Sequence, residues 1–264
     1  MMGSLDDVIT PTRAEAGWRL EVPDGWQQGR GAFGGLVLGA MTRALAGEVG
    51  DGRALRTLSA TLMAPVVVGD ARITVAILRA GSAVTTATAS LTQGGTVAAQ
   101  AVAIFGAARP DTPSWGRLAP PRATPWRELP DVRLPSPPVP TFLRHFDMRI
   151  LAGGPYSGNT TGQVLGWVRP RIAPAHRDAA LVVTLADCYF PVVLSEMTTP
   201  RPVATVSYHI ELCAGLEGLD PEAPLLHHAT APSASEGYVV DRRELWGEDG
   251  RLVALNQQVF VIIK

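Results

Sequence analysis

The chain has 264 residues, of which 46% are hydrophobic and 18% are charged, and its formal net charge is -1. Such a composition is typical of a globular protein that can bury a sizeable core in one large or two small domains. The balanced charge excludes the strongly basic surface of proteins that bind nucleic acid or an anionic membrane surface. We therefore expect a small molecule or another protein as the partner.

The beginning of the chain and its cysteines bear on where the protein works. The first residues, MMGSLDDVITPTRAEAGW, lack a basic region followed by an apolar core, and no run of about eighteen uncharged apolar residues occurs in the sequence. We expect no membrane span and a cytoplasmic location. The two cysteines, Cys188 and Cys213, lie in apolar sequence, which fits a reducing compartment and excludes a four-cysteine zinc site.

The first half of the chain has the pattern of one long helix followed by strands. Residues 33–50 carry glycine and apolar residues at helical spacing, which predicts a helix. Strand-like runs follow over residues 55–67, 71–81 and 82–105, and the last run turns at a pair of glycines, as a hairpin does.

A proline-rich stretch then divides the chain. Residues 106–140 hold prolines at a density that prevents both a helix and a central strand, so we expect an extended connector on the surface. The division gives an N-terminal unit of residues 1–106, a linker of residues 107–140 and a C-terminal unit of residues 141–264.

The second half repeats the order of the first half. Residues 179–196, AALVVTLADCYFPVVLSE, are a helix candidate in which Pro191 bends or ends the helix; a buried strand over LVVTLA is the competing assignment. The strand-like runs that follow span residues 203–212, 224–233, 237–246 and 251–264. The repeat indicates an internal duplication of an α+β unit, in which an antiparallel sheet curves around a helix.

One residue in this second helix candidate points to chemistry. Asp187 is the only charged residue between Ala179 and Leu194. An ionised carboxylate among apolar neighbours costs several kcal/mol unless partners stabilise it, so such a group commonly has a shifted pKa or takes part in a reaction. A helix-terminal or surface aspartate on the polar side of the segment is the alternative.

Four segments together resemble a known family. They are GRGAFGGLVLGAMTRAL, LADCYFPVVL, VATVSYHIEL and ELWGEDGRLVALNQQVFVI. In this order they are similar to the acyl-CoA thioesterases of the double hotdog fold, the TesB-like or thioesterase II group. The resemblance implies an α+β double hotdog, with two tandem units that each have a long central helix wrapped by a curved antiparallel sheet. It also implies hydrolysis of an acyl-CoA thioester by an activated water in fatty acid metabolism, without cofactor or metal.

The resemblance implies a set of catalytic residues in the second unit. Carried over by motif, the aspartate is Asp187, the hydroxyl is Thr205 and the amide is Gln258, which together hold the attacking water. Asp187 would accept the proton of that water, and the other two side chains would orient it. For the oxyanion, the backbone N–H groups at the helix beginning with Gly34 and Gly35 are the natural donors.

Regular strand geometry leaves two of these assignments open. Ser207 lies two residues after Thr205, so on a regular strand it faces the same side of the sheet and is an alternative hydroxyl. Gln257 and Gln258 face opposite sides, and the resemblance favours Gln258. Of the remaining candidates, Cys188 is expected to be a buried inert thiol, and the pair His227 and His228 to be structural.

Two other functions stay open at this stage. A hotdog hydratase or dehydratase uses acyl thioesters with an aspartate and a histidine, and His209, on the same face of a regular strand as Thr205 but about 13 Å away, is the candidate histidine. The second open function is that of a catalytically silent protein that binds an acyl thioester or a lipid.

The acyl group and the assembly of chains are less constrained by the sequence. The substrate is either an acyl-CoA or an acyl-carrier-protein thioester, and a homo-oligomer is expected because sheet edges or faces remain exposed. The aromatic residues Trp18, Trp26 and Phe33, expected near the helix entry, and the bulky residues after Asp187 would narrow an acyl tunnel, which favours short, branched or aromatic acyl groups.

Overall fold

One long curved sheet and two helices dominate the fold. A computed structural model describes residues 3–130, 140–213, 215–216 and 218–263 of the chain. Twelve strands form one antiparallel sheet in the order β1-β2-β6-β7-β8-β5-β11-β14-β13-β12-β10-β9. The first six of these positions belong to the N-terminal half of the chain and the last six to the C-terminal half, so the α+β class predicted from the sequence is confirmed.

The strands have the following bounds. In the N-terminal half they are β1 (Thr12–Ala14), β2 (Gly17–Val22), β5 (Ala54–Leu62), β6 (Gly69–Ala80), β7 (Val84–Gln93) and β8 (Thr96–Gly106), with β3 (Gln27–Gln28) and β4 (Gly31–Ala32) as a separate small sheet. In the C-terminal half they are β9 (Phe146–Ala152), β10 (Gln163–Pro170), β11 (Val203–Leu212), β12 (Leu225–Ser235), β13 (Tyr238–Gly247) and β14 (Leu252–Ile262).

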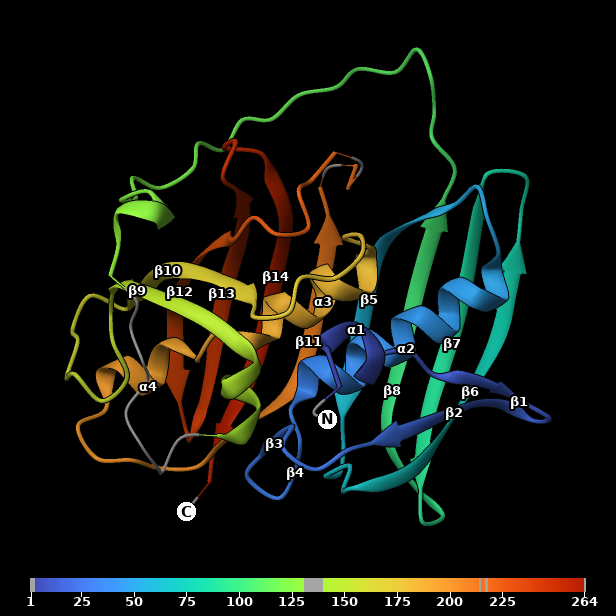
Figure 1. Cartoon of the computed structure of the whole chain (residues 1–264), viewed down its shortest axis with the longest axis horizontal. Coiled ribbons are helices and arrows are strands. Elements are labelled where there is room, and N and C mark those ends of the chain that lie inside the picture. The colour runs from blue at the N-terminus through green and yellow to red at the C-terminus, as the bar shows by residue number, and fades with distance from the viewer. Residues whose placement is uncertain (1–2, 131–139, 214, 217, 264) are drawn as a thin grey trace.

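Two helices pack against one face of the sheet and against each other. Helix α2 (Gly34–Val49) belongs to the first half and α3 (Ala179–Cys188) to the second, and the end strands of the sheet curl around in front of them (Figure 1). The hydroxyl of Thr184 donates to the carbonyl of Gly35, and Arg43 pairs with Asp178, so the two helices run antiparallel. The N-terminus of α2 therefore lies beside the C-terminus of α3.

Local sequence sets the limits of α3. The Asp178 side chain caps its N-terminus by accepting the N–H of Leu181 at 2.8 Å. The helix stops at Cys188, and the chain resumes as the short helix α4 (Val192–Glu196) directly after Pro191, which lacks the N–H that a continuous helix needs. The predicted helix is thus confirmed with a break at the proline, and the alternative strand over LVVTLA is wrong.

The two halves join through β5 and β11, which pair in the middle of the sheet. Both strands carry an irregularity near their beginning. In β5 the register shifts between Leu55 and Thr57, and in β11 it shifts between Thr205 and Ser207. Each strand therefore holds one extra residue, a β-bulge, at a corresponding position. The matching bulges support the duplication that the sequence indicates.

The described part of the linker docks on the second half of the chain around Trp126. After β8 the chain passes as an arch over the end of the sheet and reaches the short helix η1 (Trp126–Glu128) (Figure 1). Trp126 is buried with Trp167 and Trp246, and the indole N–H of Trp167 donates to the carbonyl of Thr124 at 2.9 Å. The described part of the linker is therefore extended, as predicted, but docked by a tryptophan; residues 131–139 lie outside the described residues. A second short helix, η2 (Thr141–His145), leads into β9.

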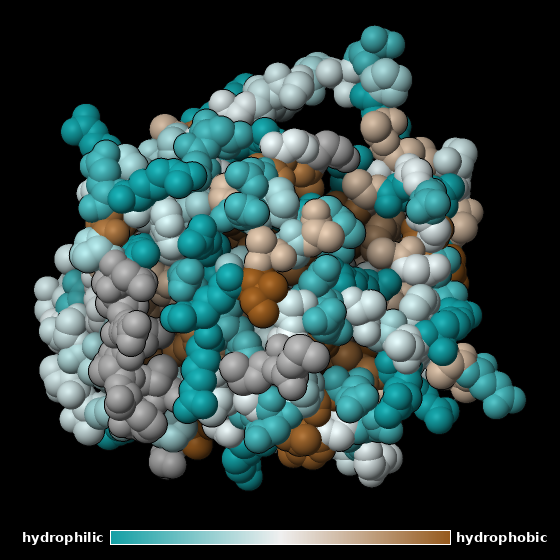
Figure 2. All heavy atoms as spheres, viewed as in Figure 1, coloured by the Kyte–Doolittle hydropathy of each residue, from teal (hydrophilic) through white to brown (hydrophobic). Residues whose placement is uncertain are grey.

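The apolar segment of α3 and α4 is part of the core. By length and composition alone, Ala179–Glu196 would pass as a membrane-crossing segment, but 78% of it is buried inside the protein. The face of the molecule that Figure 2 shows is mostly hydrophilic, with apolar residues in scattered positions. A last short helix, α1 (Leu5–Val8), packs its buried Leu5 and Val8 into the same core.

Candidate active site

Asp187 lies in the last turn of α3, where that helix meets the beginning of α2. Its side chain is only 8% exposed. A Cβ atom on Gly34 would lie 2.8 Å from the Asp187 Oδ2 atom, and one on Gly35 would lie 2.7 Å from the carbonyl oxygen of Thr184. The two glycines are therefore needed for the close approach of α2 to α3, and they place the N-terminus of α2 against the carboxylate.

The surroundings of Asp187 shift its pKa in opposite directions. Burial raises the pKa of Asp187 above its ordinary value, and the charge of Arg243, the N–H of Gly35 and the side chain of Gln258 work against that rise. The N-terminus of α2 has no side-chain cap, so its first N–H groups and the helix dipole are directed at the site. The site thus holds a carboxylate that binds a proton more readily than a surface aspartate yet has partners for its ionised form.

Thr205 and Gln258 come together on the neighbouring strands β11 and β14. The hydroxyl of Thr205 donates to the Oε1 atom of Gln258 at 3.4 Å. Gln258 is fully buried, and its Nε2 atom donates to Asn256 at 2.9 Å and to the carbonyl of Ala186 at 3.5 Å. Gln257 is exposed on the other face, so of the two glutamines only Gln258 reaches α3.

The bulge in β11 separates residues that a regular strand would place together. Because Val206 is the extra residue, Thr205 lies opposite Phe260, whereas Ser207 lies opposite Val259. Directly opposed residues share a face of the sheet, and Phe260 is buried whereas Val259 alternates to the other face. The expectation that Ser207 shares the face of Thr205 is therefore wrong.

The same bulge moves His209 away from the site. His209 pairs with Gln257 and with Ser59 on the outer face, and its Nδ1 and Nε2 atoms lie 2.6 Å from the Ser59 hydroxyl and 2.7 Å from the Glu211 carboxylate. The expectation that it shares a face with Thr205 is wrong as well. The histidine of the hydratase hypothesis thus lies across the sheet from Asp187.

A buried ion pair that the sequence reading missed supports this end of α3. Arg243 on β13 donates to the carbonyls of Ala186 at 3.0 Å and Tyr189 at 3.2 Å, and it pairs with Asp241 at 3.1 Å. Asp241 also accepts the N–H of Val192, the first residue of α4. The pair therefore fixes the break between α3 and α4, beside Asp187. The only signal in the sequence was that these two charges occupy inward positions of an alternating strand.

The aromatic residues expected near the helix entry divide between two places. Trp26 stacks on His145 at 3.7 Å, and Phe33, the residue before α2, stacks on Phe142 at 4.3 Å, so a buried aromatic cluster does lie at the entry of α2. Trp18 does not belong to it. It lies beside Gly47 near the C-terminus of α2, so that part of the expectation is wrong.

The thiol and the imidazole near Asp187 have ordinary structural roles. Burial, reinforced by the Asp187 charge, raises the pKa of the Cys188 thiol, which donates to the carbonyl of Leu185. The thiol is therefore protonated and inert, as expected. His227 is fully buried against the ring of Tyr189, and burial and the Arg243 charge hold its pKa well below the ordinary value. Across the described residues, no group of three or more His, Cys, Asp or Glu could hold a metal ion.

Comparison with protein families assigns both halves of the chain. Residues 22–106 match the family described as Acyl-CoA thioesterase N-terminal domain, and residues 117–262 match Acyl-CoA thioesterase C-terminal domain. The chain belongs to the acyl-CoA thioesterase family. No curated protein matches this member of the family in sequence.

Solved structures agree on the fold of this family member. A hot dog fold protein of unknown function from Alicyclobacillus acidocaldarius is 23% identical, with a TM-score of 0.90 over 100% of this chain and 99% of the other. The acyl-CoA thioesterase II TesB2 from Mycobacterium marinum is 20% identical, with a TM-score of 0.79 over 98% of each chain. At these identities the likeness shows the fold alone, and it confirms the double hotdog.

Proposed function

We propose that the protein hydrolyses an acyl-CoA or acyl-carrier-protein thioester to the free acid and the thiol. The observation that carries the proposal is the buried carboxylate of Asp187, which faces the N-terminus of α2 and lies near the Thr205–Gln258 pair in a chain of the acyl-CoA thioesterase family. Family membership supports the class of reaction, and this geometry supports the assignment of residues.

The proposed mechanism uses one water molecule. Asp187 accepts a proton from the water as its oxygen attacks the carbonyl carbon of the thioester, and Thr205 and Gln258 orient the water by hydrogen bonds. The negative charge that develops on the carbonyl oxygen is stabilised by the N-terminus of α2, with the N–H of Gly34 as the candidate donor. The intermediate then expels the thiolate, which takes the proton from Asp187.

Gly35 has a different part in this proposal. Because its N–H acts on Asp187 and lowers the pKa of that carboxyl against the effect of burial, it favours the ionised form that the reaction needs. The sequence suggested an oxyanion role for both glycines. That role is therefore proposed for Gly34 alone, whereas Gly35 stabilises the ionised form of the base, Asp187.

The test is the release of thiol from a panel of acyl-CoAs, followed with a thiol reagent. We expect wild type to hydrolyse at least one substrate and Asp187→Asn, which keeps the shape of the side chain, to lose about a hundredfold or more in rate. Thr205→Val should also lose activity, whereas the matched control Ser207→Val, on the outer face, should not. On β14, Gln258→Met should likewise lose activity, whereas its matched control Gln257→Met, on the outer face, should not.

Two outcomes would contradict the proposal. Equal rates for wild type and Asp187→Asn would exclude Asp187 as the base. No release from any substrate, together with binding of the acyl-CoA, would favour the silent binding protein. We see no structural support for the hydratase, because His209 lies on the opposite face of the sheet.

The buried aromatic cluster at the entry of α2 bears on the acyl group. Trp26, Phe33 and Phe142 are each at most 4% exposed, so they leave little room beside the N-terminus of α2. We propose that the site accepts short, branched or aromatic acyl groups. The values of kcat/KM across a chain-length series test this, and a clear preference for long chains would contradict it.

A further inference from the structure

A cavity lies far from Asp187, at the opposite end of the α2–α3 pair. It measures about 470 Å³ and lies between the C-terminal half of α2, the N-terminus of α3 and the ends of β5 and β8. We call it the distal pocket and define it by six of its lining residues: Thr42, Arg53, Leu55, Arg56, Phe105 and Arg177.

The distal pocket is the counterpart of the candidate active site in the other half of the chain. The bulges align Leu55 of β5 with Thr205 of β11, and each of these residues lies opposite a phenylalanine, Phe105 and Phe260. Two residues before these phenylalanines, Ala103 stands at the position of Gln258. When the two helices are aligned at their first residues, Thr42 stands at the position of Asp187.

The counterpart has therefore lost the proposed catalytic groups but kept a space. A threonine, a leucine and an alanine replace the carboxylate, the hydroxyl and the amide, so none of the three proposed catalytic groups is present at these positions. The hydroxyl of Thr42 is also taken, since it donates to the carbonyl of Leu38 at 2.8 Å. The cavity therefore lacks the arrangement of groups that the proposed hydrolysis uses.

Three arginines line this pocket beside those positions, Arg53, Arg56 and Arg177. Arg53 bonds to the carbonyls of Gly81 and Ser82 and to the hydroxyl of Thr85, and Arg56 bonds to the carbonyl of Gly106. Within the described part of the chain, neither guanidinium forms an ion pair with a carboxylate. Both are therefore available to an anion.

Arg177 is the third of these arginines and is nearly sealed from solvent. Its side chain is 6% exposed, its Nη2 atom donates to the carbonyls of Pro221 and Ala223, and its buried Nε atom has no partner among the described residues. The charge of Asp220 acts on it, but among the described residues no carboxylate forms a direct ion pair with it. A buried guanidinium without a paired anion is costly, which is a condition that a bound anion would relieve.

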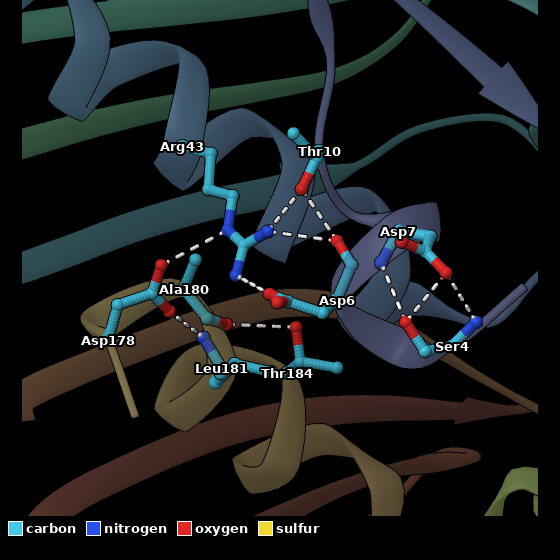
Figure 3. Close-up of polar contacts among 9 residues, drawn as sticks. All are labelled: Ser4, Asp6, Asp7, Thr10, Arg43, Asp178, Ala180, Leu181 and Thr184. Atoms are coloured by element: carbon cyan, nitrogen blue, oxygen red, sulfur yellow. Dashed lines mark hydrogen bonds and ion pairs between the residues drawn. The ribbon is translucent and has the colours of Figure 1, made fainter. Parts of the chain in front are cut away.

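The neighbouring Arg43, which also lines the distal pocket, is by contrast paired with acids of the protein itself. Figure 3 shows it bonded to Asp178 at the start of α3 and to Asp6 and Thr10 near the N-terminus. Asp178 in turn caps α3. Both the N-terminus of α3 and Arg43 are thus occupied by the protein itself, and the three other arginines remain for a ligand.

Apart from Thr42, Arg43, His176 and Asp178, the rest of the wall is apolar. Leu55, Phe105 and Leu212 line the pocket together with alanines of both helices. We propose that the distal pocket binds an amphipathic anion, with a carboxylate or phosphate head at the arginines and an apolar body against these side chains. The proposal does not depend on the hydrolysis proposed above, although the acid released by that reaction belongs to this class.

The test uses three probes of equal chain length on the full-length protein. Binding of decanoate, decyl phosphate and decanol is measured by calorimetry, with inorganic phosphate as the head group alone. We expect both decyl anions to bind, and decanol and inorganic phosphate to bind at least about tenfold more weakly, because charged hydrogen bonds and apolar burial both contribute. The comparison of decanoate with decyl phosphate tells whether a fatty acid or a phosphorylated lipid is the better source of the anion.

Variants locate the binding. Arg56→Gln should weaken decanoate binding by about tenfold, and the matched control Arg72→Gln, an exposed strand arginine outside the pocket, should leave it unchanged. Ala46→Trp places a large side chain in the pocket wall. It should abolish binding while every arginine of the pocket is retained. Asp187→Asn should bind as wild type does, which separates this pocket from the candidate active site.

Several results would overturn the inference. They are equal binding of decanol and decanoate, unchanged binding in both Arg56→Gln and Ala46→Trp, loss of binding in Asp187→Asn alone, or no binding of any decyl anion. Each of these can be observed whether or not the protein hydrolyses a thioester.

Discussion

Asp187 occupies a place that favours its neutral form. The side chain is 8% exposed, and burial is the largest influence on its pKa, which is raised. A carboxylate with a raised pKa is a stronger base when ionised, which suits the abstraction of a proton from water. The same environment makes the ionised residue a cost to the folded protein. Function and stability therefore oppose each other at this residue.

This opposition predicts how stability depends on pH. Since the folded-state pKa of Asp187 is above the unfolded value, the folded state binds more protons between the two values, and the contribution of this residue to stability falls as pH rises through that window. At neutral pH, Asp187→Asn should therefore raise the melting temperature, by about 2–4 °C per kcal/mol recovered. Below the unfolded pKa the difference should vanish.

Melting curves of both proteins across a pH series test this, and kcat/KM of wild type gives an independent measure. Activity should rise with pH through the raised pKa, at a higher pH than for an ordinary aspartate. A melting temperature of Asp187→Asn that is lower than wild type at neutral pH and equal at low pH would contradict the prediction.

The residues of the site differ in how far the sequence reveals them. Asp187 stands out because it is a single charge in an apolar helix. Arg243 and Asp241 were missed because they lie in a run of four charged residues, 241–244, which hides their alternation with the buried Val239 and Leu245. The predictions of which face of the sheet Ser207 and His209 occupy were wrong, because a bulge leaves no reliable mark in the sequence.

At the scale of elements, the contact between α2 and α3 sets the position of the site. Thr184 donates from one Oγ1 atom to the carbonyls of Gly35 and Ala180, both at 2.9 Å. A Cβ atom on Gly39 would overlap this hydroxyl. The two helices therefore touch where a glycine on one meets a threonine on the other, and Gly39 is a packing residue.

We predict that Gly39→Ala destabilises the protein by about 1–3 kcal/mol, although alanine is the better helix former by about 1 kcal/mol. Thr184→Ala removes the atom that the new methyl group would meet. The double variant should therefore lose less stability than the sum of the single variants, with a coupling of about 1 kcal/mol. Denaturant unfolding of the four proteins measures it, and strictly additive losses would show that the two residues are not in contact.

The sequence predicted some elements well and missed others. Helices α2 and α3 and the strands β5 to β8 and β11 to β14 were found because they are long and keep one periodicity. The end strands were missed: β1 and β2 are short, and β9 and β10 follow a proline-rich stretch and carry little alternation. The burial of Trp126 was also missed. Nothing in the local sequence distinguishes a tryptophan that packs against Trp167 and Trp246 from an exposed one.

At the scale of the whole molecule, part of the outer face of the sheet is open to solvent among the residues that the structure describes. In the N-terminal half, Val102 and Ile104 point outward from β8 and are 45% and 37% exposed. Small residues of the neighbouring strand β7, such as Thr86 and Thr88, flank them and keep the surface flat. We propose that chains associate through this face, which is the homo-oligomer expected from the sequence.

The prediction is that Val102→Lys reduces the mass of the assembly in solution, because an ammonium group would have to be buried in the contact. Light scattering during gel filtration measures the mass. Thr112→Lys, in the exposed arch of the linker, is the matched control and should leave the assembly intact. A wild-type protein that is monomeric, or an assembly that Val102→Lys leaves unchanged, would contradict the proposed interface.

The pairing of β5 with β11 has a consequence for the newborn chain. The N-terminal half leaves the ribosome with β5 as an unpaired edge, and β11 follows only after the linker, β9, β10 and α3, a delay on the order of ten seconds at ordinary rates of translation. An open edge can capture a strand of another nascent chain. The edge of β5 that pairs with β11 spans only residues 57–61 and begins directly after the bulge at Arg56, so the irregularity that marks the distal pocket also bounds the length of edge that another nascent chain could capture.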